Sequence, residues 1–397
     1  MVTRRHPGVS DENGRRAVRG HPRPQSLGRV LVLSAVAMVT SAVLGQAQSA
    51  VPVITEHPAS RVVVVGQTWT LRVTVADSSG VSFQWRRNGI AIPGATGSSY
   101  AFHAAQLPPA GPGGDVFDVV IRNAAGSVVS NPATIRVVTA EGPWKGGLWI
   151  AAGPDGVTWS APQPFIGPAG VPSLARTSAG RLVATFQWFP FDTPEAFDRV
   201  AVSFSDDGGT TWTVPVAIHV EGLPAAYMRP FDPTIVALDD GRLRLYFTSN
   251  TGPGSVNAFY SAISTDGITY DWETGVRFSP GRGTVDCAVA HWNGLWHLTS
   301  PIGAPHEGAY HAVSSDGLQF TRQADIPSSG SFNWLGNLIS VDGALRFYGN
   351  SPAGLWYAES RDGLSWTSPV VMNVRGGDPA VVTDQGLWLL VFVGPGF

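Results

Sequence analysis

Short runs in which hydrophobic and polar residues alternate recur between residues 52 and 138, and turn-forming residues separate them. Alternation with a period of two places every second side chain on the same face, which predicts half-buried β-strands. Strands that recur at roughly ten-residue spacing predict a β-sandwich over residues 52–138. The runs that show this pattern are residues 62–65, 68–73, 81–87, 116–122 and 133–138.

From about residue 146 onward, the pattern becomes a repeated phrase of three strands. An inner strand opens each unit, often with Asp-Pro, and a second strand follows an Asp-Gly or Asn-Gly turn. The third strand ends in a turn that contains an aspartate. The clearest unit comprises residues 231–236, 240–247 and 261–267. Repetition every roughly 50 residues indicates an array of supersecondary units.

The two ends of this array complement each other. Residues 377–382 and 387–392 begin a fifth unit that lacks its third strand and its aspartate turn. The missing part stands at the front, because residues 148–159 closely match residues 355–366 of the fourth unit. Together the two segments complete one blade, which leaves no free sheet edge. We therefore predict an all-β fold: a sandwich followed by a five-bladed β-propeller over residues 146–397, closed by both ends of that segment.

Composition supports this class. Charged residues make up only 14% of the 397 residues, whereas tryptophan (14), glycine (47) and proline (31) are abundant, as in turn-rich all-β proteins. The single cysteine, Cys287, excludes an internal disulfide, and no Cys/His cluster has the spacing of a zinc site. A formal net charge of −3 with scattered arginines argues against nucleic acid as a partner.

The first residues have the features of a targeting segment. Arginines crowd the start, an apolar run covers residues 30–44, and Gly45-Gln46-Ala47 places small residues where a signal peptidase cleaves. We predict a signal peptide over residues 1–47 and a secreted, cell-surface or periplasmic protein. An uncleaved anchor is the alternative, although the apolar run is short for a membrane span. After cleavage we expect no stable membrane span.

The predicted sandwich resembles bacterial immunoglobulin-like domains of the I-set kind. The resemblance rests on Trp85 in an F-x-W-x-x-N-G pattern, on Pro93-Gly94-Ala95, and on an N-x-x-G-x-x-x-S-x-x-A run that ends at Ala133. Apolar residues occupy the regions of the family's paired cysteines, so packing around Trp85 must hold the core. The resemblance implies a spacer, or alternatively an adhesive module.

An aspartate turn repeats five times in the array. Residues 205–212 read S-x-D-x-G-x-T-W, and shorter copies centre on Asp155, Asp266, Asp316 and Asp362. This turn resembles the Asp-box of sialidases and related propellers. The carboxylate in such a turn accepts backbone N–H groups, and the glycine supplies a positive φ. We therefore expect these aspartates to be structural and to lie on the outer hairpins.

Three other acids stand at the starts of inner strands, where propellers bind ligands at the mouth of the channel: Asp232, Asp286 and Asp378. Carboxylates that converge on one cleft shift each other's pKa values and can perform acid/base chemistry on a glycosidic bond. Glu307 and Glu221, on neighbouring loops, are further candidates for a carboxylate pair. The alternatives are solvated loop charges and aspartates that brace the blade starts.

The blade count and the Asp-Pro openings resemble the arabinanase, xylosidase and fructosidase glycosidases. That resemblance implies a glycoside hydrolase with an acid on the inner strands of three successive blades, two Asp and one Glu. Here the acids fall on units two, three and five, and Asp286 replaces the customary Glu. A sialidase would need three arginines, for which Arg176, Arg199 and Arg229 are available, but its Arg-Ile-Pro motif is absent. We rank sialidase activity below other sugar chemistry.

Side chains near strand ends are candidates for binding the sugar. Blade packing is the alternative for the aromatic ones, and a non-catalytic carbohydrate-binding or adhesion protein is the alternative function. We expect no cofactor and no metal at the site, with a channel ion such as Ca²⁺ left open, and a carbohydrate or glycan as the partner. The candidates for substrate binding are Arg229, Trp188, Phe191, Asn333, Trp334 and His306.

Overall fold

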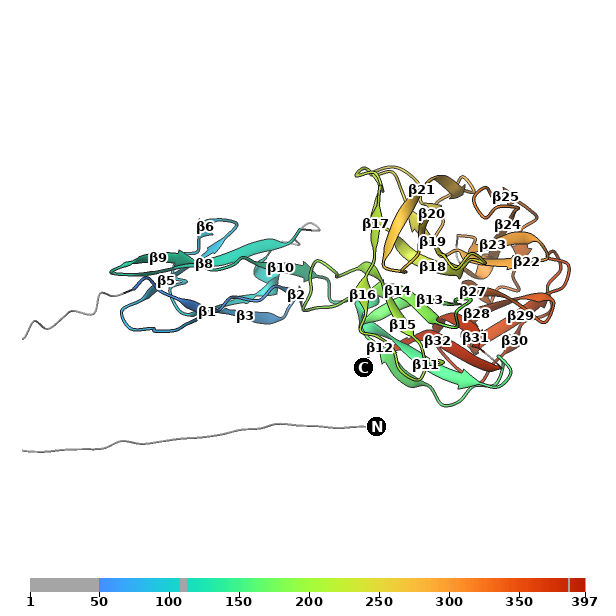
Figure 1. Ribbon diagram of the computed structural model, residues 1–397, viewed down its shortest axis with the longest axis horizontal. Helices are drawn as coiled ribbons and strands as arrows, with labels where there is room; N and C mark the ends of the chain where they lie inside the picture. The colour runs from blue at the N-terminus through green and yellow to red at the C-terminus, as the bar shows by residue number, and fades with distance from the viewer. Residues whose placement is uncertain (1–49, 108–112, 304, 385, 397) are drawn as a thin grey trace, which may run out of the picture. The chain divides into compact units, whose positions relative to one another are not determined.

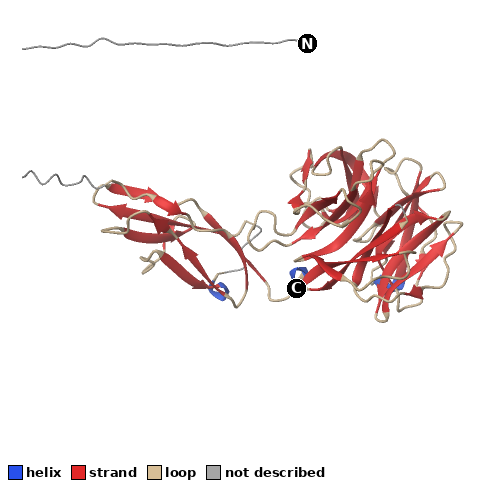
Figure 2. Ribbon diagram, turned by 60° about the horizontal axis from the view of Figure 1, so that its bottom comes forward, coloured by secondary structure: helices blue, strands red, loops and turns tan. Residues whose placement is uncertain are grey.

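The computed structural model describes residues 50–107, 113–303, 305–384 and 386–396. Over these ranges the chain consists of β-strands, loops and three short 3-10 turns, without an α-helix (Figure 2). None of the helical turns described is long and apolar enough to cross a membrane. The predicted signal peptide, residues 1–47, lies outside the described residues.

The first part is built from two facing groups of strands that share one core. β2, β10, β8, β5 and β6 form one sheet with β9 on β8, whereas β3 pairs with β7 and β1 with β4. Trp85 is fully buried at the centre, and its Nε1 donates to the Gly97 carbonyl at 2.9 Å. The elements are β1 (Ile54–Glu56), β2 (Arg61–Val64), β3 (Thr68–Arg72), β4 (Thr74–Val75), β5 (Ser82–Arg87), β6 (Ile90–Ala91), β7 (Ser99–His103), η1 (Ala104–Gln106), β8 (Asp115–Asn123), β9 (Gly126–Val129) and β10 (Ala133–Val138).

The second part is a five-bladed β-propeller (Figure 1). Blade one contains β13 (Ala169–Arg176), β14 (Leu182–Trp188), β15 (Arg199–Ser205) and β16 (Val216–Ala217). Blade two contains β18 (Phe231–Ala237), β19 (Leu243–Ser249), β20 (Ala258–Ser264), β21 (Thr269–Phe278) and β17 (His219–Glu221). Blade three contains β22 (Ala288–Trp292), β23 (Leu295–Pro301), β24 (Gly308–Ser314), β25 (Thr321–Arg322) and β26 (Ile326–Pro327), with η3 (Pro305–Glu307) before β24. Blade four contains β27 (Asn333–Val341), β28 (Ala344–Ser351), β29 (Gly354–Ser360) and β30 (Val370–Val371).

The fifth blade joins the two ends of the propeller segment. It contains β31 (Gly377–Asp384), β32 (Leu387–Pro395), β11 (Gly146–Gly153) and β12 (Gln163–Ile166), and η2 (Pro143–Lys145) precedes β11. β11 pairs antiparallel with β32 from Gly146 opposite Pro395 to Gly153 opposite Trp388. The inner strands β13, β18, β22, β27 and β31 contact one another in this order, and β31 contacts β13 again. The predicted five-bladed ring and its closure are confirmed.

In the repeated aspartate turns, the carboxylate forms hydrogen bonds with backbone N–H groups of its own turn. The Oδ1 atom of Asp266 accepts the N–H groups of Ile268 and Thr269, both at 2.8 Å. These bonds hold the pKa of the Asp266 carboxyl below its usual range. Gly267 supplies a φ of 77°, and Tyr270 is fully buried beside the turn. The carboxylate is thus occupied within its own turn, which fits a structural role.

A hydrophobic cluster connects the sandwich strands with a loop of blade one. Val62 and Val138 are buried together with Phe189 and Phe197. The backbone N–H of Val62 also donates to the carbonyl of Phe191 at 2.7 Å. The loop formed by residues 189–197 is therefore fixed at both of its ends, by the packing of Phe189 and Phe197, before β15 begins.

Because β32 closes the ring, truncating one of its side chains should destabilise the protein, and the loss of stability should depend on whether that side chain is buried. Leu390 is fully buried, whereas Leu387 in the same strand is 40% exposed. We expect Leu390→Ala to lower the free energy of unfolding by about 2–5 kcal/mol, because it removes buried methylene groups and leaves a cavity. Leu387→Ala is the matched control and should change it by less than about 0.5 kcal/mol. Urea unfolding followed by tryptophan fluorescence measures both, and equal effects would contradict the closure.

Candidate functional site

The inner strands open with an irregular backbone that aims side chains at the channel. The register of the strand pairs shifts between Gly170 and Ser173, between Phe231 and Thr234, and again at Gly377. The residues at these openings have positive φ angles, a strained conformation for any residue except glycine. They are Val171 (48°), Asp232 (49°) and Asp378 (44°), and Asp286 (54°) stands at the same point before β22.

Three of these residues, Asp232, Asp286 and Asp378, meet around one small cavity, which we call the aspartate cavity. The prediction from sequence that they converge therefore agrees with the structure. Its volume of about 10 Å³ leaves room for about one water molecule. The remaining lining residues are Val171, Pro172, Ser173, Pro233, Thr234, Cys287, Gly336 and Asn337.

Burial makes all three carboxyl groups weaker acids. It raises the pKa of Asp232 to about 7, and the negative charge of Asp378 contributes to this shift. Burial raises the pKa of Asp378 to about 6. Burial, together with the charges of Asp232 and Asp378, also raises the pKa of Asp286 well above its usual range. At neutral pH the group therefore retains protons that an exposed aspartate would have released.

Asp286 also carries an unpaired polar atom. Its Oδ1 is buried, and no described residue forms a hydrogen bond with it. A buried oxygen without a partner is costly when it is charged, which agrees with a protonated carboxyl. No group of three or more His, Cys, Asp or Glu side chains in the described ranges could hold a metal ion.

Asp232 also faces a second, wider space, which we call the mouth pocket. This pocket has a volume of about 220 Å³. Its wall includes a second carboxylate, Asp198, and the guanidinium of Arg229. The lining residues are Pro143, Gly170, Val171, Gln187, Phe189, Asp198, Met228, Arg229, Phe231 and Asp232.

Asp198 is fixed in the mouth pocket by two partners. Its Oδ1 accepts from Nε2 of Gln187 at 2.9 Å, and its Oδ2 pairs with the guanidinium of Arg229. Its φ of 62° interrupts the extended backbone directly before β15. Two carboxyl groups of unlike character therefore share one pocket: Asp232, whose proton is retained, and Asp198, which is paired with a cation.

The sequence did not single out Asp198 or Gln187 as site residues. The available signal was an aspartate at the end of a long loop, next to a strand. Arg229, which the sequence did propose, lies in the mouth pocket. Among the predicted site residues, only Asp232 and Arg229 reach this pocket.

The predicted aromatic residues lie in hydrophobic packing. Trp334 is only 4% exposed, and its ring contacts Phe347, Trp356 and Trp366, so the expectation that it stacks on a sugar is wrong. Phe191 packs edge-on against Phe197 in the cluster next to the sandwich. Trp188 is partly exposed at the end of β14 and packs against the cluster between blades five and one.

The other predicted residues lie outside both cavities. Asn333 begins β27 but does not line the aspartate cavity; Asn337 does, because the register shift of this strand is one residue longer. The Asn337 side chain already forms a structural hydrogen bond, because its Oδ1 accepts from the Val381 N–H at 3.0 Å. Glu307 and His306 are exposed on η3. Neither borders the aspartate cavity or the mouth pocket.

Comparison with known solved structures gives distant likenesses. No family model matches the chain, and no curated protein matches its sequence. Among solved structures, it is similar to an α-L-arabinofuranosidase from Clostridium thermocellum, with 16% identity and a TM-score of 0.45 over 56% of this chain and 81% of that one.

A β-xylosidase named RS223 shows 13% identity and a TM-score of 0.42, over 57% of this chain and 91% of that one. An arabinanase from Bacillus subtilis shows 14% identity and a TM-score of 0.38, over 57% of this chain and 96% of that one.

The raised pKa of Asp378 predicts a pH-dependent stability. The folded chain keeps this proton up to about pH 6, whereas an unfolded aspartate releases it near its ordinary value of 3.8. Stability therefore falls as the pH rises through this window. We expect Asp378→Asn, which cannot ionise, to raise the unfolding temperature at about pH 8 and to raise it less at about pH 4.

The control variant, Asp316→Asn, should change the unfolding temperature in the opposite direction. Backbone N–H groups of Leu318 and Gln319 hold the pKa of Asp316 below its usual range, so its contribution is present at neutral pH and is lost in acid. Asp316→Asn should therefore lower the unfolding temperature at about pH 8. Thermal unfolding at both pH values measures the two variants, and shifts of the same sign at about pH 8 would contradict the assignment.

Proposed function

We propose that this protein hydrolyses a glycosidic bond of a carbohydrate bound in the mouth pocket. One observation carries the proposal: a carboxyl group with a pKa of about 7, Asp232, and an arginine-paired carboxylate, Asp198, line the same pocket. Two carboxyl groups in unlike environments are the usual equipment for this reaction.

The two carboxyl groups take different parts in the reaction. Asp232 donates its proton to the glycosidic oxygen as the bond from that oxygen to the anomeric carbon breaks. A water molecule adds to the anomeric carbon, and its proton passes to the Asp198 carboxylate. Arg229 holds Asp198 in place through their ion pair.

Asp286 and Asp378 act on Asp232 and do not contact the substrate in this proposal. Both line the aspartate cavity, which is too narrow for a sugar, and neither lines the mouth pocket. The charge of Asp378 raises the pKa of Asp232. We therefore assign Asp286 and Asp378 as positioning residues in this proposal.

The setting of the reaction follows from the remaining sequence predictions. A signal peptide over residues 1–47 would place the enzyme outside the cytoplasm. An immunoglobulin-like module over residues 52–138 would act as its spacer or adhesive part. Detection of the mature N-terminus in a secreted fraction tests the first of these statements.

The proposal predicts loss of turnover in two variants. We expect Asp232→Asn and Asp198→Asn each to reduce hydrolysis of the accepted aryl-glycoside by about 100- to 10,000-fold, because each loses its proton transfer. The panel comprises an arabinofuranoside, a xyloside, a fructoside surrogate, a galactoside and a sialoside. Asp240→Asn, an exposed aspartate paired with Arg242, is the matched control and should retain full activity. Full activity in the Asp232 variant would refute the assigned acid.

A second prediction concerns the pH profile. A general acid with a pKa of about 7 loses its proton above that pH, so activity should decline on the alkaline side of about pH 7. Asp378→Asn removes a negative charge that raises the pKa of Asp232, so the alkaline limb should move to lower pH. An unchanged limb in a folded, active variant would show that Asp378 does not influence the acid.

A non-catalytic carbohydrate-binding protein is the second candidate. The narrowness of the aspartate cavity favours it, because only one of the three inner-strand acids borders a space wide enough for a sugar. Sugar binding without turnover of any panel member, by a folded protein, would establish this candidate instead.

A further inference from the structure

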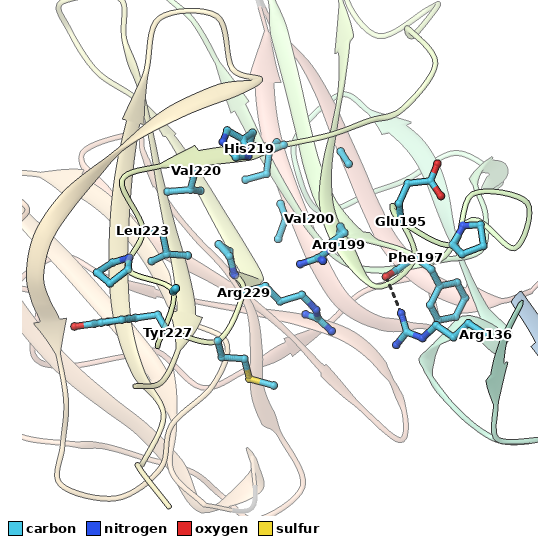
Figure 3. Close-up of a pocket in the computed structure, with 17 residues that line it drawn as sticks. Arg136, Glu195, Phe197, Arg199, Val200, His219, Val220, Leu223, Tyr227 and Arg229 are labelled. Atoms are coloured by element: carbon cyan, nitrogen blue, oxygen red, sulfur yellow. Dashed lines mark hydrogen bonds between the residues drawn. The ribbon is translucent and has the colours of Figure 1, made fainter. Parts of the chain in front are cut away.

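Next to the mouth pocket lies a larger pocket that the proposed reaction does not use (Figure 3). It has a volume of about 750 Å³, within the range of about 300–1,000 Å³ typical of ligand sites. The two pockets share Met228 and Arg229, so they adjoin at the start of blade two. A ligand held in one can extend into the other.

Three guanidinium groups from distant parts of the chain converge in this pocket, which we call the arginine pocket. Arg136 comes from β10, Arg199 from the start of β15, and Arg229 from the loop before β18. Their side chains extend toward the same region in Figure 3. The rest of the lining includes the apolar side chains of Val200, Val220, Leu223 and Tyr227.

The positive charges are only partly compensated within the described residues. Arg229 pairs with Asp198, and Arg136 donates to the Phe197 carbonyl at 3.3 Å while lying over its ring. For Arg199, no ion pair or hydrogen bond to a described residue is found, apart from the electrostatic attraction of Asp198. Glu195, the carboxylate among the residues that line this pocket, points away from the three guanidinium groups in Figure 3.

The guanidinium groups lie close enough to repel one another. Arg199 is exposed, but its partial removal from water lowers the pKa of its guanidinium, and the charges of Arg229 and Arg136 lower that pKa further. Burial and the charge of Arg229 likewise lower the pKa of Arg136, against the attraction of Asp198. Like charges held together in a concave pocket attract an anion, and a chain with a net charge of −3 has no general excess of cations to explain them.

We propose that the arginine pocket binds an oxyanion carried by the glycan, either the carboxylate of a sugar acid or a sulfate ester. The inference rests on the proposed carbohydrate site in the mouth pocket and names its substrate class, an acidic glycan. The planar guanidinium fork of Arg199 can donate two parallel hydrogen bonds to such a group. Arg229 contributes to both pockets and connects the anionic group with the bond to be cleaved.

Binding, measured without reference to catalysis, tests the inference. The probes are methyl glucuronide, a 6-sulfated methyl glucoside and neutral methyl glucoside, each titrated calorimetrically into the full chain. We expect at least one anionic probe to bind more tightly than the neutral one, and added salt to weaken it. Arg199→Gln should weaken that binding about 10- to 100-fold. Arg199→Lys, which keeps the charge but not the fork, should lose less.

The matched control is Arg242→Gln, which removes the same charge from an exposed turn and should alter the affinity by less than about twofold. Equal affinity for the neutral and anionic probes, or an Arg199→Gln variant that binds as the wild type does, would overturn the inference. The preferred anionic probe distinguishes carboxylate from sulfate.

The outcome also separates this inference from the proposed hydrolysis. Binding of an acidic probe that depends on Arg199, without turnover of any glycoside, would uphold the arginine pocket and reject the enzyme. Turnover of neutral glycosides without binding of any anionic probe would uphold the enzyme and reject the acidic substrate.

Discussion

The antiparallel pairing of β11 with β32 is the constraint on which the site depends. It joins strands that lie at opposite ends of the propeller segment and turns five separate sheets into a ring. Once the ring is closed, the starts of the inner strands face one axis. Asp378, on the closing blade, thereby comes next to Asp232 and Asp286 from blades two and three. An open array would leave these carboxyl groups apart and hydrated, with ordinary acidity.

The strained backbone at the blade openings belongs to the architecture and not to the acids. Val171 has the same positive φ as the three aspartates, although it is β-branched and carries no charge. The fold therefore imposes this conformation on the opening residue whatever its chemistry. Aspartate tolerates it better than most residues, and three of these positions hold one. The fold provides the direction of the side chain, and burial then provides the weak acidity that proton donation near neutral pH requires.

Much of the fold could be predicted from local pattern, because the aspartate turns and strand repeats encode the blades directly. The match between residues 148–159 and 355–366 was sufficient to predict closure. The convergence of the inner-strand aspartates followed from the same repeat. Asp198 could not be found in this way, because its role arises from an ion pair with Arg229, which follows it by about thirty residues in the next blade. The hydrophobic pattern of the sequence also cannot distinguish an aromatic ring that packs between strands from one that is exposed for stacking on a sugar, as Trp334 illustrates.

The loop of blade one, residues 189–197, explains how the two pockets are coupled. Phe189 and Phe197 are buried against Val62 and Val138, so the chain reaches β15 from a fixed position. Asp198 then has a positive φ, and the next residue resumes the strand. The two neighbours consequently serve different spaces: Asp198 lines the mouth pocket, and Arg199 lines the arginine pocket. Displacement of this loop would move an acid and a cation together, so in the proposed reaction both the recognition of an acidic substrate and the cleavage of the bond would depend on one local structure.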